Sequence, residues 1–243
     1  MSSPNALATL LWIIVPYLAL AVFVLGHIWR YRYDGFGWTT RSSQIYESKL
    51  LRIGSPMFHY GILFVVIGHA VGLLVPKSWT EAVGLSDQWY HLMAITVGTA
   101  AAVGTIGGLA ILLYRRRTNR RVFGATTVLD KLMYLMLAVT ILAGTYSTIV
   151  ESGLGGYDYR EGISIWFRQF WTLRPDAALM MEAPLGFQIH VLSAILLFAV
   201  WPFTRLVHVF TVPVGYVTRP YIVYRSKDRV RQPERRGWEH IDF

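Results

Sequence analysis

The sequence predicts an all-α integral membrane protein built from five transmembrane helices. Hydrophobic residues make up 54% of the 243 residues and charged residues only 15%, whereas soluble domains carry about 25% charged residues. Five apolar runs are long enough to cross a hydrocarbon core, which takes about 20 residues. The basic residues fall between these runs, which is typical of membrane proteins.

The five apolar runs follow one another through polar connections. They cover approximately residues 6–28, 53–75, 89–114, 127–150 and 184–209. The first run has no small-residue cleavage site, so we expect a transmembrane helix there and not a signal peptide. The predicted organisation is a transmembrane domain over residues 1–215, followed by a polar tail over residues 216–243. We expect this tail to contact cytoplasmic partner subunits.

Basic residues are unevenly distributed among the connections. They are frequent after the first run, after the third run and in the tail, and rare in the alternate connections. The positive-inside rule therefore predicts a multi-pass protein of the cell membrane with its N-terminus outside and its C-terminus in the cytoplasm. The net charge of +9 then reflects topology in a lipid bilayer and not nucleic-acid binding. The external segment Ile163–Leu173 mixes aromatic residues with a charge and is expected in the membrane interface.

Four of the seven histidines lie in two of the apolar runs: His59 and His69 in the second, His190 and His208 in the fifth. Ionisable side chains at membrane depth are costly and usually functional. Antiparallel neighbouring helices would face His69 with His190 and His59 with His208. Two axial imidazoles on iron leave no open position, which suits electron transfer. The sequence therefore predicts two stacked haem b groups. The absence of cysteine excludes iron–sulfur ligation and covalent haem attachment.

The spacing of the histidines differs between the two runs. His59 and His69 are ten residues apart, roughly 15 Å along a helix, while His190 and His208 are eighteen residues apart, roughly 27 Å. We expect tilt, slanted haem planes and a kink at Pro202 to absorb this difference.

Gly61, Gly68 and Gly72 on the second run would leave room for a flat macrocycle. Close packing between helices is an alternative explanation for each glycine taken alone. The histidines likewise have an alternative role, as hydrogen-bonding groups between helices.

Four further residues are candidates for the site. His91, at the outer start of the third run, could accept a proton from a quinol, and Tyr90 lies beside it; an ordinary interfacial histidine is an equally good interpretation. Arg205 and Arg116 could pair with haem propionates. A topological or snorkelling role is the alternative for both arginines.

Several segments are similar to the gamma subunit of respiratory nitrate reductase, and together they cover nearly the whole chain. They are Ser55–Leu63 (SPMFHYGIL), Gly68–Gly72 (GHAVG), Trp201–His208 (WPFTRLVH), Val212–Arg219 (VPVGYVTR), Arg30–Phe36 (RYRYDGF) and Ser42–Gln44 (SSQ).

The resemblance implies a di-haem cytochrome b subunit that oxidises menaquinol or ubiquinol near the outer face. His69 and His190 would bind the outer haem, and the other histidine pair the inner one. Electrons would pass to an iron–sulfur beta subunit and then to a molybdenum-containing alpha subunit that reduces nitrate to nitrite. This chain would not itself carry the nitrate site. In the family a lysine between the second and third helices helps to bind quinol. Lys77, the only lysine of that connection, lies too early, which leaves Tyr90 and His91 as candidates.

Two other functions fit the same residues. One is a di-haem b subunit of another quinone-linked complex, similar to heterodisulfide reductase or formate dehydrogenase. The other is a non-redox membrane anchor whose histidines only pack between helices. A b-type absorption spectrum with about two haems per chain would exclude the anchor.

Overall fold

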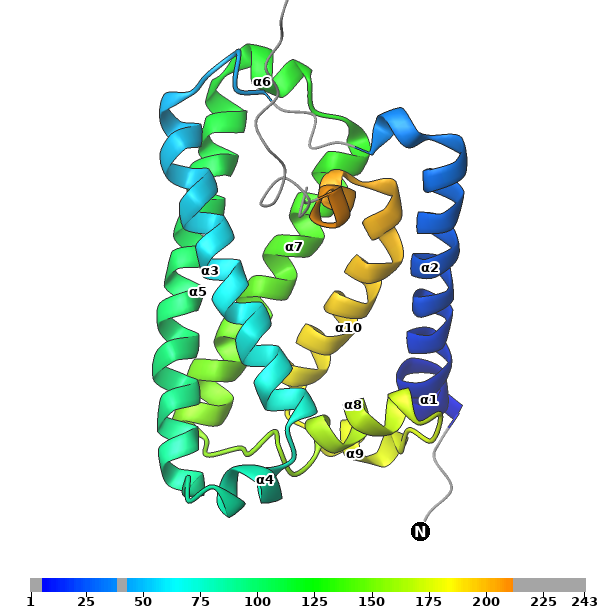
Figure 1. The fold of residues 1–243 in the computed structure, drawn as a ribbon, viewed down its shortest axis with the longest axis vertical. Helices are drawn as coiled ribbons and strands as arrows, with labels where there is room; N and C mark the ends of the chain where they lie inside the picture. The colour runs from blue at the N-terminus through cyan, green and yellow to red at the C-terminus, as the bar shows by residue number, and fades with distance from the viewer. Residues whose placement is uncertain (1–5, 39–42, 212–243) are drawn as a thin grey trace, which may run out of the picture. The chain divides into compact units, whose positions relative to one another are not determined.

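The computed structural model describes residues 6–38 and 43–211, which form an all-helical bundle (Figure 1). No β-strand occurs in these two ranges. Five helical segments are long and apolar enough to cross a membrane, namely Ala6–Tyr33, Lys49–Leu74, Asp87–Thr118, Val128–Leu154 and Leu185–Phe203. The predicted fold class is therefore confirmed. The predicted tail of residues 216–243 lies outside the described residues.

Most of the spans contain more than one helical element. The first consists of α1 (Ala6–Thr9), the π-helical η1 (Leu10–Ile14) and α2 (Val15–Tyr33). The second and third are the single helices α3 (Lys49–Leu74) and α5 (Asp87–Thr118). The fourth joins α7 (Val128–Tyr146) to the π-helical η3 (Ser147–Leu154), and the fifth joins α10 (Leu185–Val200) to the 3-10 turn η4 (Trp201–Phe203). The remaining elements are η2 (Gly35–Gly37), α4 (Lys77–Ala82), α6 (Arg120–Gly124), α8 (Ile163–Trp171), α9 (Ala177–Met181) and η5 (Arg205–Thr211).

Local side-chain caps determine where three of these helices begin. The Ser86 side chain accepts a hydrogen bond from Trp89 N at the start of α5, and Asn119 caps α6. Thr127 and Asp130 form a reciprocal capping box at the start of α7. These caps satisfy backbone N–H groups that a helix leaves without partners in its first turn.

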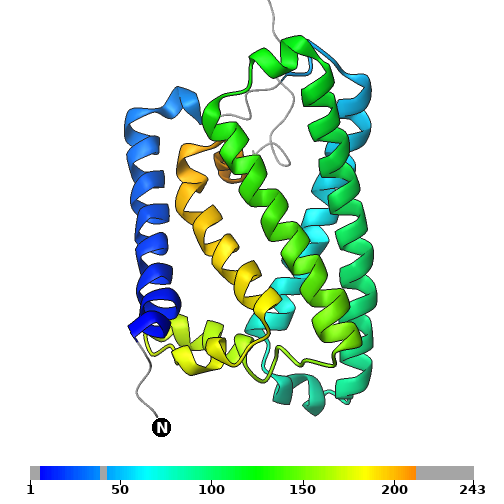
Figure 2. The same ribbon diagram turned by 180° about the vertical axis from the view of Figure 1, so that it is seen from behind.

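The spans pack in two groups. Helix α3 packs mainly on α5, whereas α10 packs on α7 and α2 (Figures 1 and 2). The contact between α3 and α5 is close because Gly61 has no side chain: a β-carbon there would lie 2.6 Å from the backbone nitrogen of Thr105. At Gly61, close helix packing is therefore the correct interpretation of the glycine.

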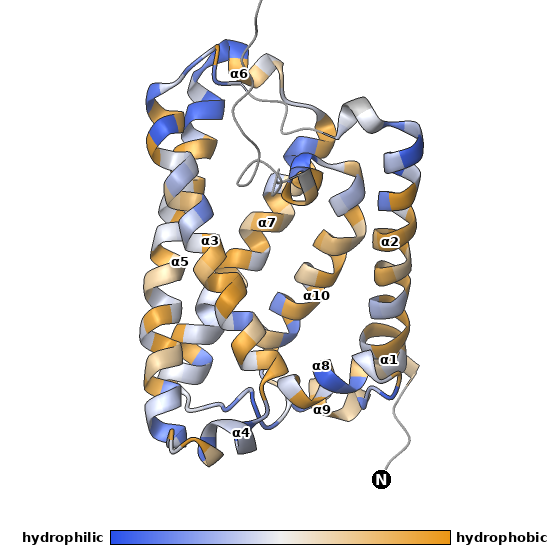
Figure 3. Cartoon of the chain, in the orientation of Figure 1, coloured by the Kyte–Doolittle hydropathy of each residue, from blue (hydrophilic) through white to orange (hydrophobic). Residues whose placement is uncertain are grey.

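Hydrophobic residues predominate along the middle of the spans, and hydrophilic residues gather near α6 and α4 (Figure 3). This distribution suits a bilayer, whose hydrocarbon core excludes polar groups. Helix α3 is the least buried span: 11% of its most apolar stretch is buried, against 17–28% for the other four. The helix that carries two of the candidate ligands therefore has much of its surface free for other contacts.

The expected segment Ile163–Leu173 forms α8, which ends at Trp171 and lies with α9 across one end of the bundle (Figure 1). The Ser164 hydroxyl donates to the carbonyl of Gly72 at 2.9 Å, and Arg168 donates to that of Leu73 at 3.1 Å. Because the last carbonyls of a helix lack intrahelical donors, α8 stabilises the end of α3.

The fifth span departs from the prediction. A continuous helix to residue 209 with a kink was expected, but α10 ends at Val200 and η4 follows as a 3-10 turn. Pro202 lacks an N–H group and its ring clashes with the preceding turn, so an α-helix cannot continue through it. Thr204 is then extended (φ −110°, ψ 179°), and η5 begins at Arg205. The expected kink is a complete break of the helix.

Candidate functional site

The structure brings the four histidines of the second and fifth spans together as two imidazole pairs. The ring centroids of His69 and His190 lie 5.8 Å apart, and those of His59 and His208 lie 6.1 Å apart. A histidine nitrogen sits about 2 Å from a first-row metal. Two such nitrogens on opposite sides of one metal atom are therefore about 4 Å apart, and their ring centroids about 6 Å apart. Both pairs match this spacing.

All four imidazoles are oriented by a hydrogen bond between Nδ1 and a backbone carbonyl. The partners are Ser55 O for His59 (2.7 Å), Val65 O for His69 (2.7 Å), Thr140 O for His190 (2.9 Å) and Arg205 O for His208 (2.7 Å). A carbonyl oxygen only accepts, so Nδ1 carries the hydrogen and Nε2 keeps its lone pair. Histidines that bind metals are held in this way.

The surroundings of the pairs suit a flat ligand between them. A β-carbon placed on Gly68, next to His69, would meet no atom within 4 Å, whereas one on Gly72 would lie 2.7 Å from the hydroxyl of Tyr159. Of the glycines singled out on the second span, Gly68 therefore fits the macrocycle and Gly72 fits close packing. Within residues 6–38 and 43–211, no three His, Cys, Asp or Glu side chains gather as a metal site. Porphyrin iron needs only two axial imidazoles, so these residues fit haem.

After the break, η5 turns away from the axis of α10 (Figure 1). His208 therefore reaches His59, although eighteen residues separate it from His190 and only ten separate His59 from His69. Arg30 of α2 stabilises this break. Its guanidinium, in a side chain that is 3% exposed, donates to the carbonyls of Pro202 at 2.6 Å and Thr204 at 3.1 Å. Gly26, one turn earlier, lets α2 approach, since a β-carbon there would lie 2.8 Å from the Pro202 ring. Arg30 therefore supports the segment that carries His208.

Arg205 forms an ion pair that sequence analysis did not anticipate. Its Nε and Nη2 donate to the two carboxylate oxygens of Asp130 at 2.9 and 2.8 Å. Asp130 is only 2% exposed and also belongs to the capping box of α7. The one signal for this pair in the sequence is an acidic residue near the start of an apolar run. A role of Arg205 at a haem propionate remains a prediction.

Arg116 is buried and already has protein partners. Its Nη1 donates to the hydroxyl of Thr126 at 2.7 Å, and its guanidinium lies 5.1 Å from the ring centroid of Tyr134. This cation–π contact and the hydrogen bond stabilise its charge at the end of α5. Its contact with a haem propionate likewise stays a prediction.

The two candidates for quinol binding contact other side chains and backbone. Tyr90 is buried, its hydroxyl lies 3.4 Å from that of Tyr159, and the Arg160 guanidinium lies 3.8 Å from its ring centroid. Burial raises the pKa of Tyr159, which keeps the phenol neutral. Nε2 of His91 lies 3.2 Å from the carbonyl of Ser152 in η3.

Lys77 is engaged in an ionic cluster. Its ammonium lies 2.6 Å from Asp87, 2.8 Å from Glu161 and 3.5 Å from Asp158. The hydrogen bonds to Asp87 and Glu161 raise the pKa of Lys77 above its ordinary value. A lysine that stays protonated cannot accept a proton, which agrees with its exclusion as the quinol-binding lysine.

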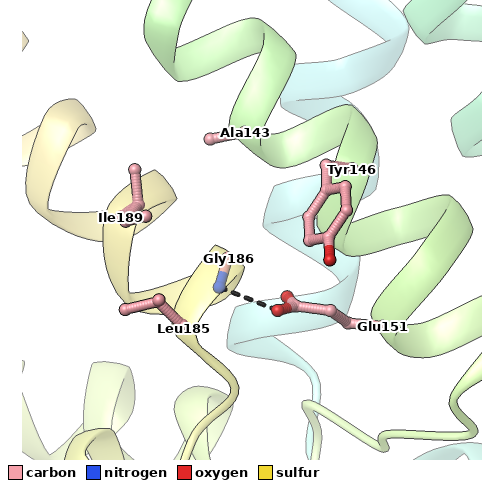
Figure 4. A pocket seen from close by; sticks show the side chains of 6 residues that line it. All are labelled: Ala143, Tyr146, Glu151, Leu185, Gly186 and Ile189. Atoms are coloured by element: carbon pink, nitrogen blue, oxygen red, sulfur yellow. Dashed lines mark hydrogen bonds between the residues drawn. The ribbon is translucent and has the colours of Figure 1, made fainter.

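A cavity of about 290 Å³ opens between α7, η3 and α10 (Figure 4). We call it the Glu151 cavity; its lining residues are Ala143, Tyr146, Glu151, Leu185, Gly186 and Ile189. The Glu151 carboxylate accepts hydrogen bonds from the backbone N–H groups of Gly186 (2.7 Å) and Phe187 (3.0 Å). Sequence analysis missed this cavity, because Glu151 looks like the first polar residue after an apolar run.

Comparison with known proteins identifies the family. The model of the nitrate reductase gamma subunit family matches residues 8–227. The chain belongs to this family. The predicted resemblance to the gamma subunit is therefore confirmed.

Three relatives illustrate the range of similarity. The nitrate reductase gamma chain of Bacillus subtilis is 44% identical over 218 residues, which cover 90% of this chain and 98% of the relative. The respiratory nitrate reductase 2 gamma chain of Escherichia coli is 36% identical over 220 residues, covering 88% and 95%. The nitrate reductase-like protein NarX of Mycobacterium tuberculosis is 55% identical over 238 residues, covering 96% of this chain and 36% of NarX. The chain therefore spans little more than a third of NarX.

Replacing Arg30 should affect the His59–His208 pair selectively. Arg30→Ala leaves the carbonyls of the break without a charged donor, at a cost of about 3 kcal/mol or more in unfolding free energy. We expect the variant to unfold at a lower temperature in detergent and to lose the haem predicted at His59 and His208. Arg32→Ala, on the exposed face of the same helix, is the control and should retain the wild-type haem content. Equal haem content in both variants would contradict this role of Arg30.

Gly144 of α7 should be required for the orientation of His190. A β-carbon at Gly144 would lie 2.7 Å from Cε1 of the imidazole, so Gly144→Ala must displace the ring. We expect loss or a shifted absorption spectrum of about one of two haems, because only the His69–His190 pair is disturbed. Gly98→Ala, whose β-carbon would meet Thr148 at an ordinary 3.4 Å, should leave the spectrum unchanged. An unaltered spectrum in Gly144→Ala would show that the ring has another position.

Proposed function

We propose that this chain is the membrane cytochrome b subunit of a quinol:nitrate oxidoreductase. In this role it oxidises quinol near the outer face and delivers electrons to cytoplasmic iron–sulfur and molybdenum subunits that reduce nitrate to nitrite. Two b haems, bound by the two imidazole pairs, would supply one-electron redox chemistry across the membrane. Belonging to the gamma subunit family supports the partners and the overall reaction.

One observation supports the haem sites above all others. Two imidazole pairs from different spans have ring centroids 5.8 and 6.1 Å apart, and each Nδ1 is held by a carbonyl. Histidines that only joined helices by hydrogen bonds would bond to each other or to polar side chains of the neighbouring helix. Here three of the four Nδ1 atoms bond within their own segment, so these hydrogen bonds do not join the two spans.

Other residues of the chain would orient the four histidines and neutralise buried charges within the membrane. The carbonyl partners fix the tautomer of each histidine. The pair of Arg205 and Asp130 keeps a cation and an anion neutralised beside η5, where an unpaired charge would be costly. With the predicted orientation, protons from quinol would be released outside while its electrons move inward, so turnover would generate a proton-motive force.

Family membership favours nitrate reductase over the other partner complexes. A heterodisulfide-reductase-like or formate-dehydrogenase-like complex would use the same imidazole pairs, but the matching family model and the gamma chains of B. subtilis and E. coli favour nitrate reductase. A non-redox anchor gives no reason for imidazole pairs at metal spacing.

Single histidine variants test the proposal. His69→Ala and His190→Ala should each remove the same haem, and His59→Ala and His208→Ala the other, because each iron would lose one of two axial ligands. The measurement is the haem stoichiometry and the low-temperature absorption spectrum of the purified complex. His27→Ala is the matched control, since the His27 ring packs against Phe23 and Phe210 outside both pairs. A colourless wild-type complex would refute the proposal.

A further inference from the structure

We propose that two carboxylates of the fourth span, Glu151 and Asp130, position the haem ligands that the fifth span carries. This inference rests on the proposed function and assigns each carboxylate to one of its haems. Glu151 sets the position of His190 in the outer pair. Asp130 sets the position of His208 in the inner pair. These carboxylates are the two acidic residues of the span Val128–Leu154, and ionisable side chains at membrane depth are costly and usually functional.

Glu151 completes the N-terminus of α10. That helix begins after Pro184, which provides no side-chain cap, and the first N–H groups of a helix lack intrahelical partners. The two carboxylate oxygens of Glu151 accept hydrogen bonds from the N–H groups of Gly186 at 2.7 Å and Phe187 at 3.0 Å (Figure 4 shows the first). The positive end of the helix dipole also favours an anion here. Glu151 therefore caps α10 from a neighbouring span.

The close approach of this carboxylate depends on Gly186. A β-carbon at Gly186 would lie 2.7 Å from both Oε1 and Oε2 of Glu151, which is closer than real β-carbons come to other atoms. His190 lies four residues after Gly186, about one turn later on the same face of the helix. The carboxylate therefore holds the turn of α10 that precedes the ligand.

His190 itself is also held by the fourth span. The carbonyl of Thr140 lies 2.9 Å from Nδ1 of the imidazole. The Thr140 hydroxyl donates to that of Ser193 at 3.1 Å, and the Ser193 hydroxyl donates to the carbonyl of His190 at 2.9 Å. With Glu151 one turn earlier, these contacts fix α10 against movement along or about its axis. Loss of the Glu151 contacts would move the imidazole relative to His69.

Asp130 has the corresponding role near the start of the fourth span. Its carboxylate, in a side chain that is 2% exposed, accepts from Nε and Nη2 of Arg205 at 2.9 and 2.8 Å. It also accepts from the backbone N–H of Thr127 at 3.0 Å. The carbonyl of Arg205 is the partner of Nδ1 of His208, at 2.7 Å. The residue that orients this imidazole is therefore fixed to α7 by its own side chain.

The two carboxylates should act on different haems. Asp130 and Glu151 are 21 positions apart on one span, which corresponds to roughly 30 Å along a helix, and electrostatic interactions weaken with distance. A negative charge stabilises the oxidised iron, so its removal raises the reduction potential of the nearer haem. Removing Asp130 acts in the same direction, because it leaves the Arg205 guanidinium without its counter-ion.

Neutral variants of similar size test this inference. Glu151→Gln and Asp130→Asn complexes are purified with their partner subunits, and both haems are titrated potentiometrically by absorption spectroscopy. The haem that His69→Ala removes is taken as the outer one. Glu151→Gln should raise the potential of the outer haem by about 59 mV, which is a tenfold change in a one-electron equilibrium constant, and leave the inner haem unchanged. Asp130→Asn should raise the potential of the inner haem alone.

Two further variants separate positioning from a general change in charge. Glu182→Gln is the matched control, because Glu182 is an exposed carboxylate two residues before Pro184, and it should leave both potentials unchanged. Gly186→Ala keeps the charge of Glu151 but forces its carboxylate away from the N–H groups of α10. This variant should shift the potential and the absorption band of the outer haem only.

Specific outcomes would overturn the inference. Outer-haem potentials that match the Glu182→Gln control in both Glu151→Gln and Gly186→Ala would mean that Glu151 caps α10 without acting on His190. Shifts of both haems in either carboxylate variant would mean a general effect on the bundle. If Glu151→Gln failed to assemble, Gly186→Ala would decide, and loss of assembly in both would reduce Glu151 to a structural cap. A wild-type complex without haem would instead refute the proposed function.

Discussion

The fold depends on satisfying backbone polar groups inside an apolar medium. In a membrane each unpaired N–H or C=O group is costly, so a helix that breaks needs donors from elsewhere. Pro202 breaks the fifth span, and Arg30 of α2 donates to the carbonyls of Pro202 and Thr204. The same requirement explains why Glu151 caps α10 and why Ser164 and Arg168 of α8 donate to the end of α3. At these three helix ends, a residue of another segment supplies the missing hydrogen-bond partner.

These repairs also build the site. The break after α10 lets His208 reach the depth of His59, which a straight helix would overshoot. The carbonyl of Thr140 on α7 orients His190, and Gly144 on the same helix makes room for its ring. The buried Arg205 and Asp130 neutralise each other, because an isolated buried ion would destabilise the bundle. Residues that complete the helix packing, such as Thr140 and Gly144, therefore also position the candidate ligands.

Family and geometry support different parts of the function. Membership of the gamma subunit family supports the proposed complex, whereas the imidazole spacing supports the proposed cofactor. The Glu151 cavity includes one residue of a π-helical stretch, η3, that no periodicity of the sequence indicates.

The sequence alone determined the five spans, the four histidines and their pairing order, because hydrophobic length and residue spacing are local properties. It also predicted a distortion at Pro202, since proline cannot continue an α-helix. The complete break, the donors from Arg30, the pair of Asp130 with Arg205 and the Glu151 cavity were decided by tertiary structure. Each of these joins residues between 35 and 174 positions apart, and only the packing of the helices brings such partners within hydrogen-bonding distance.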